Sequence, residues 1–406
     1  MAERFSMGDA AEPISLAEDD MALELVPWDA LRVAAARVNA WFEDCAEGRA
    51  FGEDTEDRLA SLREWIAERM RKRSMVSVVE DGIVLTSGLE QSLEWVVRRL
   101  TVSGDAMLVE RPTGLAGLSV LVRCGVQVIG VDCDDQGVQV EELERLLAGE
   151  GAASVKPRLL YVAPTYGDPT GRVWSLKRRQ EVLGLCRAHG VCIIEDDSCG
   201  ELKFHGDAPG VPTLYALAGE AGGVVYVSSF ESIVAPSVQV GWVAGKRTMM
   251  VGLGVGTGEC CLEEGEEVDS ADAEACVRNQ LVLAELLIDF DLDAHVRRLA
   301  DTYRERMYAM QRQLRIQQIA GVTWSEPEGG KFLWLTLPDG LDADALRRLT
   351  MIMGVDIAPG SQFYAGEAMR NRVRLCFTGC SVEQIERGIE IVGEAIRDFT
   401  GRWSDG

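Results

Sequence analysis

Short apolar runs alternate with amphipathic segments through the first two thirds of the chain. The segment Ser61–Met70 (SLREWIAERM) places apolar residues at helical spacing. Uniformly apolar strands separated by crossover helices predict a mostly parallel sheet that is covered on both faces. The six runs expected to form its strands are Gly82–Leu85, Ala106–Val109, Val126–Val131, Leu159–Val162, Val191–Ile194 and Val224–Val227.

The pattern changes after about residue 290. A long charged helix is expected from about Ala294 to Leu314, and a strand-like GKFLWL run follows at Gly330–Leu335. A helix over 342–352, a strand at Val373–Phe377 and a last helix from Ser381 complete a smaller α+β region. We therefore predict a tail over 1–12, an N-terminal part of a small domain over 13–50, a large α/β domain over 51–290, and the rest of the small domain over 291–406.

Composition narrows the possible partners. The chain has 406 residues and a net charge of −25. Because this charge repels phosphodiester backbones and anionic lipid, we expect neither nucleic acid nor membrane as a partner. No export signal and no apolar run near the length of a membrane span is present. The acidic segment Glu259–Asp272 is expected to be solvated, with an interaction surface as the alternative.

Cysteine and histidine usage argues against a metal site. The eleven cysteines are scattered, without a C-x-x-C unit, and the one adjacent pair is Cys260–Cys261. Only three histidines are present. We therefore expect reduced thiols, a cytoplasmic protein and no zinc.

Candidate chemistry gathers in the segment Val162–Leu202. A P-T-G turn leads into a basic-headed helix and then into a strand that ends in Asp196 and Asp197. Ligands of α/β sheets bind beyond the carboxyl ends of the strands, so these two carboxylates are expected at a site. Solvated or capping carboxylates remain the alternative.

This segment resembles the class I/II aminotransferase pattern of fold-type I enzymes, which use pyridoxal 5′-phosphate (PLP). The nearest branch includes the catalytic domains of MocR regulators and the 2-aminoadipate aminotransferases, where the turn reads N-P-T-G and the strand ends in E-D-D-x-Y. The resemblance covers roughly Ala30 to Ile396. It implies an α/β PLP-transferase (aspartate aminotransferase-like) fold, with a large mostly parallel sheet domain, a small α+β domain and a homodimer. Other blocks that follow the family's order are Thr86–Leu93, Gly104–Thr113, Ser228–Gly241, Gly329–Leu335, Pro359–Tyr364 and Arg372–Phe377.

The resemblance also shows which cofactor contacts differ. The position of the lysine that bonds to PLP holds Ser232, and the phosphate-binding arginine seven residues later is Gln239. Near the pyridine 3-oxygen the family has an asparagine and a tyrosine, and this chain has Asp168 and Cys199 at those positions. Where the family has an aromatic residue that stacks on the pyridine ring, this chain has Gly114. A serine hydroxyl cannot form an imine, so the chain is expected to lack covalent PLP chemistry.

Other family positions are kept or only partly changed. Asp196 stands where the pyridinium-pairing aspartate belongs, and the Thr86–Gly88 turn resembles the phosphate cup. Arg374 occupies the position of the substrate-carboxylate arginine, although pairing with an internal acid is the alternative. In the family a tyrosine reaches across the dimer interface to the cofactor phosphate of the neighbouring subunit, and this chain has Phe51 at that position. Of the six lysines, Lys331 is the one whose relation to the cleft is least certain.

Three functions follow from these observations. The first is a PLP-independent enzyme of amino-acid-related or specialised-metabolite biosynthesis that binds a small-molecule carboxylate and needs no cofactor. The second is a non-catalytic pseudoenzyme, either a heterodimer partner of an active paralogue or a ligand sensor. The third is a PLP-dependent aminotransferase with a displaced lysine. A MocR-type DNA-binding regulator is disfavoured, because no winged-helix domain precedes Ala30.

The expected site follows from the first of these functions. The candidate catalytic residues are Asp168, Asp196, Cys199 and Ser232. The candidate substrate-binding residues are Arg374, Gln239, Gly114, Ser87 and Gly88.

Overall fold

The computed structural model describes residues 13–44, 53–74, 82–150, 156–205, 210–246, 249–250 and 270–404. Phe51, the Cys260–Cys261 pair and nearly all of the acidic segment Glu259–Asp272 lie outside these ranges. The interpretations placed on those residues therefore stay predictions.

The large sheet has the strand order β2-β9-β8-β7-β6-β3-β4-β5. The central strands β8, β7, β6, β3 and β4 run parallel to one another. Strand β9 runs antiparallel to both β8 and β2, and β5 runs antiparallel to β4. This sheet confirms the predicted fold class. The bounds are β2 Ile83–Thr86, β3 Ala106–Arg111, β4 Gln127–Asp134, β5 Gly137–Val138, β6 Leu159–Val162, β7 Cys192–Asp196, β8 Val224–Ser229 and β9 Gly241–Ala244.

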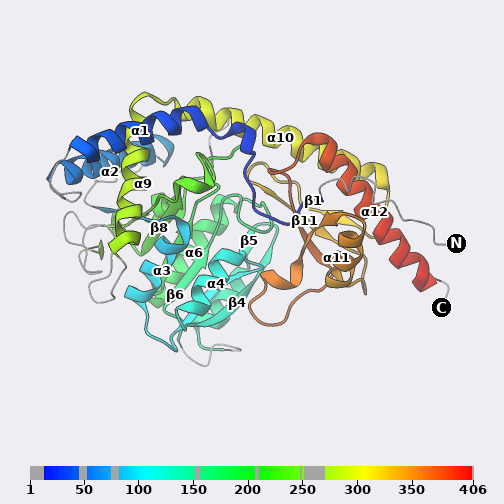
Figure 1. Cartoon of the computed structure of the whole chain (residues 1–406). Coiled ribbons are helices and arrows are strands. Elements are labelled where there is room, and N and C mark those ends of the chain that lie inside the picture. Colours follow the sequence, from blue (N-terminus) through cyan, green and yellow to red (C-terminus); the bar gives the residue numbers. More distant parts are fainter. Residues whose placement is uncertain are drawn as a thin grey trace.

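Helices cover both faces of this sheet (Figure 1). Successive residues of a strand point to opposite faces, so Leu108 of β3 packs in one buried cluster and Met107 packs in another. The cluster around Leu108 includes residues of α5 and α6, and the cluster around Met107 includes residues of α3 and α4. The helices are α3 Leu89–Leu100, α4 Leu115–Arg123, α5 Val140–Leu147, α6 Leu176–His189 and the short α7 Leu214–Ala218.

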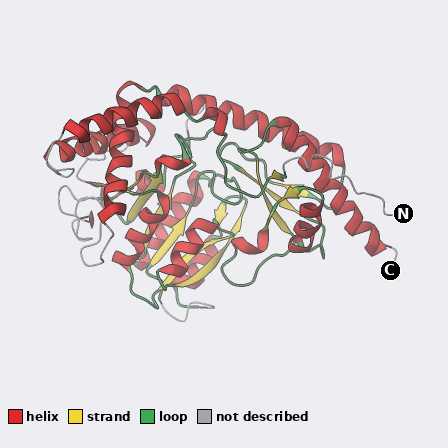
Figure 2. Cartoon of the chain, in the orientation of Figure 1, coloured by secondary structure: helices red, strands yellow, loops and turns green. Residues whose placement is uncertain are grey.

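The C-terminal region forms a second sheet, with the order β10-β11-β14-β13 and antiparallel pairing throughout. Figure 2 shows these strands beside the helices that cover them. The long helix α10 runs along the molecule from α9 to α12 (Figure 1). The bounds are α10 Leu292–Gln317, β10 Thr323–Trp324, β11 Phe332–Thr336, α11 Ala343–Ile352, β13 Ala358–Pro359, β14 Arg372–Cys376 and α12 Val382–Ser404.

Three helices at the N-terminal and central parts of the chain lie close together (Figure 1). They are α1 Trp28–Asp44, α2 Glu53–Ser74 and α9 Ser270–Asp289. The pattern at Ser61–Met70 predicted only the middle of α2, and α1 and α9 were not predicted. Strand β9 was also missed, because Gly241–Ala244 has only four residues.

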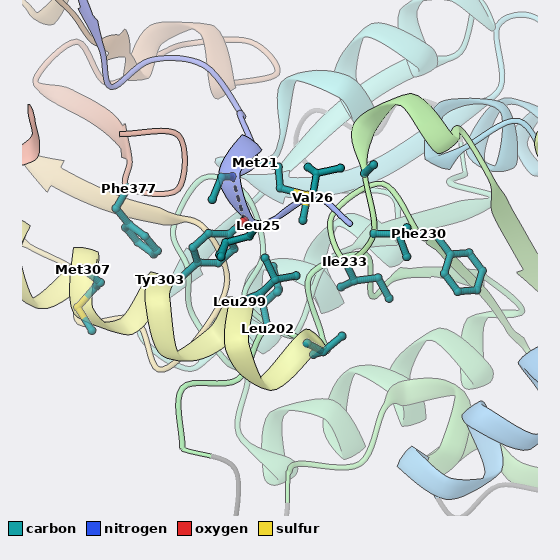
Figure 3. Packing of buried hydrophobic residues seen from close by; sticks show 14 of the residues in the cluster. Met21, Leu25, Val26, Leu202, Phe230, Ile233, Leu299, Tyr303, Met307 and Phe377 are labelled. Carbon is teal, nitrogen blue, oxygen red and sulfur yellow. Dashed lines mark hydrogen bonds between the residues drawn. The ribbon is translucent and has the colours of Figure 1, made fainter. Parts of the chain in front are cut away.

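The residues between β1 (Ile14–Ser15) and α1 run from the C-terminal region past the cleft that lies at the large sheet. Strand β1 pairs in parallel with β12 (Val355–Asp356) of the C-terminal region. The chain then packs Met21, Leu25 and Val26 near Leu299 and Tyr303 of α10 (Figure 3). The N–H of Ala22 donates to the hydroxyl of Tyr303 at 3.3 Å. This packing brings Asp19 to the mouth of the cleft described below. The predicted domain boundaries stay a prediction.

None of the described helices is both long and apolar enough to pass through a bilayer.

Candidate functional site

A cleft of about 520 Å³ lies at the carboxyl edge of the large sheet. The loops after β2, β3, β6, β7 and β8 form it, together with the start of β11 and the N-terminal segment. This is the place where a doubly covered sheet offers a binding site. Seven of the nine predicted site residues line it, namely Ser87, Gly114, Asp168, Asp196, Cys199, Ser232 and Gln239. The other two, Gly88 and Arg374, contact side chains that line it.

Asp196 is held at the end of β7 by two hydrogen bonds. The hydroxyl of Tyr161 donates to its Oδ2 at 2.7 Å, and the N–H of Ser198 donates to its Oδ1 at 2.9 Å. The side chain is almost fully buried, and burial raises its pKa even though both donors oppose the rise. Both oxygens of Asp196 therefore already accept hydrogen bonds from the protein.

Asp168 forms an ion pair with Arg374. Nη1 of Arg374 lies 3.0 Å from each carboxylate oxygen of Asp168, and Nη2 donates to the carbonyl of Ala17 at 2.6 Å. The guanidinium also lies over the rings of Phe332 and Phe363, with its Cζ 4.3 and 4.9 Å from their centroids. Burial acts to lower the pKa of Arg374, but Asp168 and Asp19 raise it, so the group stays charged. In this structure Arg374 is therefore paired with an internal acid, which is the alternative to binding a ligand carboxylate.

Gly114 gives Asp168 its room. A Cβ at position 114 would lie 3.0 Å from Oδ2 of Asp168 and 3.2 Å from its Cβ. Contacts this short require one of the two groups to move. A larger side chain at position 114 is therefore incompatible with the observed position of Asp168.

Ser232 is contacted by Lys331, the residue that immediately precedes β11. Nζ of Lys331 donates to Oγ of Ser232 at 3.2 Å and forms an ion pair with Asp19. Both side chains of the hydrogen bond are about nine-tenths buried. Burial acts to lower the pKa of Lys331, but the charge of Asp19 outweighs it and the pKa is raised. The amine is therefore an ammonium and not a nucleophile in this state.

Glu231 was not among the predicted site residues. Its Oε2 accepts the N–H of Leu89, the first residue of α3, at 3.2 Å. A Cβ on Gly88, where φ is +91°, would lie 2.6 Å from its Oε1. The neighbouring N–H of Ser87 donates to Oε1 of Gln91 at 2.6 Å. The sequence signal was the E in S-F-E-S, where the resembled pattern has S-F-S-K.

The two remaining candidates differ in exposure. Cys199 is buried, and burial raises its pKa to about 12, so the thiol stays protonated near neutral pH. Gln239 is exposed and adopts a left-handed backbone, with φ of +45°. The cysteines within the described ranges carry free thiols. The part of the chain that the structure describes contains no group of three or more His, Cys, Asp or Glu that could hold a metal ion.

A large mostly parallel sheet with a cleft at its carboxyl edge and a small second sheet defines an aspartate aminotransferase-like protein of fold type I. The kynurenine aminotransferase of Pyrococcus horikoshii matches with a TM-score of 0.82 at 29% identity, over 96% of this chain and 91% of that chain.

Sequence comparison agrees with the fold. The model for aminotransferase class I and II matches residues 35–392. Aromatic-amino-acid aminotransferase 1 of Thermococcus litoralis is 31% identical over 339 residues, which are 83% of this chain and 78% of that protein. The 2-aminoadipate transaminase of Thermus thermophilus is 29% identical over 376 residues, 92% of this chain and 87% of that protein. The chain belongs to the class I and II aminotransferase family.

Proposed function

We propose that this family member handles an amino- or keto-acid-like small molecule in the cleft without covalent PLP, as a repurposed enzyme of amino-acid-related or specialised-metabolite biosynthesis. The observation that carries the proposal is Ser232 at the position of the family's lysine, beside Glu231 on the N-terminus of α3. In this function Asp168, Asp196, Cys199 and Ser232 are the candidate reacting groups.

The residues present do not fit PLP. Its phosphate would meet the Glu231 carboxylate at the N–H of Leu89. Two like charges 4 Å apart repel by about 1 to 4 kcal/mol, depending on the local dielectric. Gly114 offers no ring for stacking, and the space beside it is filled by Asp168. We therefore assign no chemical step to the cofactor.

The ligand's carboxylate is proposed to bind Arg374, as the resemblance implies. Because Nη1 of Arg374 already donates to Asp168, a ligand carboxylate must displace that side chain. The ammonium of Lys331 and the hydroxyl of Ser232 are placed to hydrogen-bond the other end of such a ligand, since both line the same cleft. Asp196 can accept a hydrogen bond from an amine there.

Calorimetric titration with glutamate and 2-oxoglutarate tests the ligand class. The variant Asp168→Asn frees Arg374 and keeps the side-chain size, so we expect it to bind both acids about tenfold more tightly than wild type, the equivalent of one charge-assisted contact. The matched control Asp135→Asn removes an exposed carboxylate that pairs with Arg172, and should change neither affinity. Equal affinities of wild type and Asp168→Asn would remove Arg374 from the site.

A second candidate is a PLP-dependent aminotransferase in which Lys331 replaces the missing lysine. The observation that favours it is the 3.2 Å hydrogen bond between Nζ of Lys331 and Ser232. The ion pair with Asp19 opposes it, because it holds the amine protonated.

Borohydride reduction after incubation with PLP, followed by peptide mass spectrometry, separates the two candidates. Under the first proposal, labelling of Lys331 does not exceed that of the exposed Lys177. Selective labelling of Lys331, together with transaminase activity that is lost in Lys331→Met, would establish the second candidate and end the first.

Oligomeric state bears on the remaining alternative. We propose a homodimer, as the resemblance implies. A pseudoenzyme that serves an active paralogue would instead form a heterodimer, which mixing with paralogues and measuring mass by light scattering would detect.

A further inference from the structure

The N-terminus of α3 is an anion site that is filled by the protein itself. A helix N-terminus offers unpaired N–H groups and a partial positive charge, so it favours an anion. Here the N–H of Leu89 donates to the Glu231 carboxylate, and the N–H of Ser87 donates to Gln91. The Glu231 carboxylate also accepts the hydroxyl of Ser229, the last residue of β8.

We propose that Glu231 is an internal substitute for a ligand phosphate, and that the cleft therefore selects unphosphorylated small molecules. This inference rests on the proposed function in one respect, that the cleft binds a small molecule. It makes Glu231 the residue that determines this specificity.

Two physical reasons support the selection. The first is space, because the carboxylate lies against Gly88 so closely that a Cβ there would be 2.6 Å from Oε1, and a phosphate cannot enter while it remains. The second is charge. Of the described residues that line the cleft, five are carboxylates and one, Lys331, is a cation that already pairs with Asp19. A doubly charged phosphate would thus enter negative surroundings.

Paired ligands that differ only by the phosphate provide the test. Pyridoxine and pyridoxine 5′-phosphate both lack an aldehyde, so neither can react with a lysine. Because the phosphate ester meets the Glu231 carboxylate and the other acidic groups of the cleft, calorimetry should give a wild-type affinity for pyridoxine about fivefold or more above that for pyridoxine 5′-phosphate. In Glu231→Ser, pyridoxine 5′-phosphate should bind about tenfold to hundredfold more tightly than pyridoxine, because a charge-assisted contact at the helix N-terminus becomes available.

The control is Glu94→Gln, which removes a charge of the same helix outside the cleft lining and leaves the N-terminus of α3 filled, and it should leave the ratio at its wild-type value. If Glu231→Ser does not fold, the same two affinities are measured for Glu231→Gln and compared with those of wild type. A wild-type affinity for the phosphate ester that equals or exceeds the affinity for pyridoxine would overturn the proposal, as would a Glu231→Ser variant that binds neither compound or keeps the wild-type ratio. Failure of the proposed function is seen separately, in the labelling of Lys331.

Discussion

The strands of the large sheet and the loops at their carboxyl edge differ in the kind of side chain that they carry. Every residue of β6 and β8 is buried, and the interior of these strands is filled by apolar side chains of the kind that any sheet covered on both faces requires. The carboxyl edge instead carries charged side chains, of which Lys331 and Arg374 are buried, and these are paired within the protein. Asp168 pairs with Arg374, Lys331 with Asp19, and Glu231 with the N-terminus of α3. The comparison teaches that the strands follow the general demands of a covered sheet, whereas the cleft depends on specific pairs of side chains that come from distant parts of the chain.

The largest expected effect is on the internal ion pair. Arg374→Met leaves the Asp168 carboxylate without its cation and the carbonyl of Ala17 without a donor. Removing one partner of a buried pair costs about 3 to 5 kcal/mol of unfolding free energy, measured by urea titration. The double variant Asp168→Leu/Arg374→Met should regain a large part of this loss. Costs that simply add would show that the two side chains are not coupled.

Truncation of a buried side chain in the large sheet should destabilise the fold, as it does in any hydrophobic core. Ile193 of β7 is fully buried, and Ile193→Ala is expected to cost about 2 to 5 kcal/mol of unfolding free energy through lost burial and the cavity left behind. Ile288 of α9 is 68% exposed, so Ile288→Ala serves as the matched control and should stay within about 0.5 kcal/mol. A similar cost at both positions would contradict the burial of β7.

A smaller effect concerns pH. Burial raises the pKa of Glu110 to about 7, although the N–H of Ala163 and the indole of Trp174 oppose the rise. A carboxyl whose pKa is higher in the folded state stabilises the fold fully below its unfolded pKa of 4.5, and that stability is lost as the pH rises through about 7.

Between about pH 5 and about pH 8, the unfolding free energy of wild type should therefore fall. That of Glu110→Gln should fall by up to about 3 kcal/mol less, because this variant has no carboxyl to titrate. Urea titrations at the two pH values measure this difference. Glu144 is an exposed carboxyl of α5, and Glu144→Gln should keep the wild-type dependence. A Glu110→Gln variant with the wild-type slope would show that this carboxyl does not titrate in the interval.

Local sequence patterns were sufficient for most of the framework. All six predicted strands of the large sheet are present, because a buried strand is apolar along its whole length and this signal is local. Helix α1 escaped prediction because only a narrow apolar stripe, including Ala34 and Val38, is buried. The resemblance also placed Ser232, Asp168 and Gln239 at one cleft, since these residues sit at fixed places in its blocks.

The partners of those residues could not be predicted in the same way. Lys331 and Ser232 are separated by 99 positions, and Arg374 and Asp168 by 206. Such contacts depend on how two sheets and the N-terminal segment are placed in space, and no local pattern records that placement. Glu231 could have been flagged from its place in the S-F-E-S stretch, but the role of its carboxylate required the position of α3.

The close approach of Gly114 to Asp168 constrains the order in which this chain can change. An aromatic ring cannot be introduced at position 114 while Asp168 remains where it is, because even a Cβ would press on that side chain. Exchange of Asp168 for asparagine would not relieve this contact by itself, because the two side chains have the same size. The side chain at 168 must move away from position 114, and its ion pair with Arg374 opposes that movement. Positions 114, 168 and 374 are therefore expected to change together, and libraries of single substitutions would overlook such combinations.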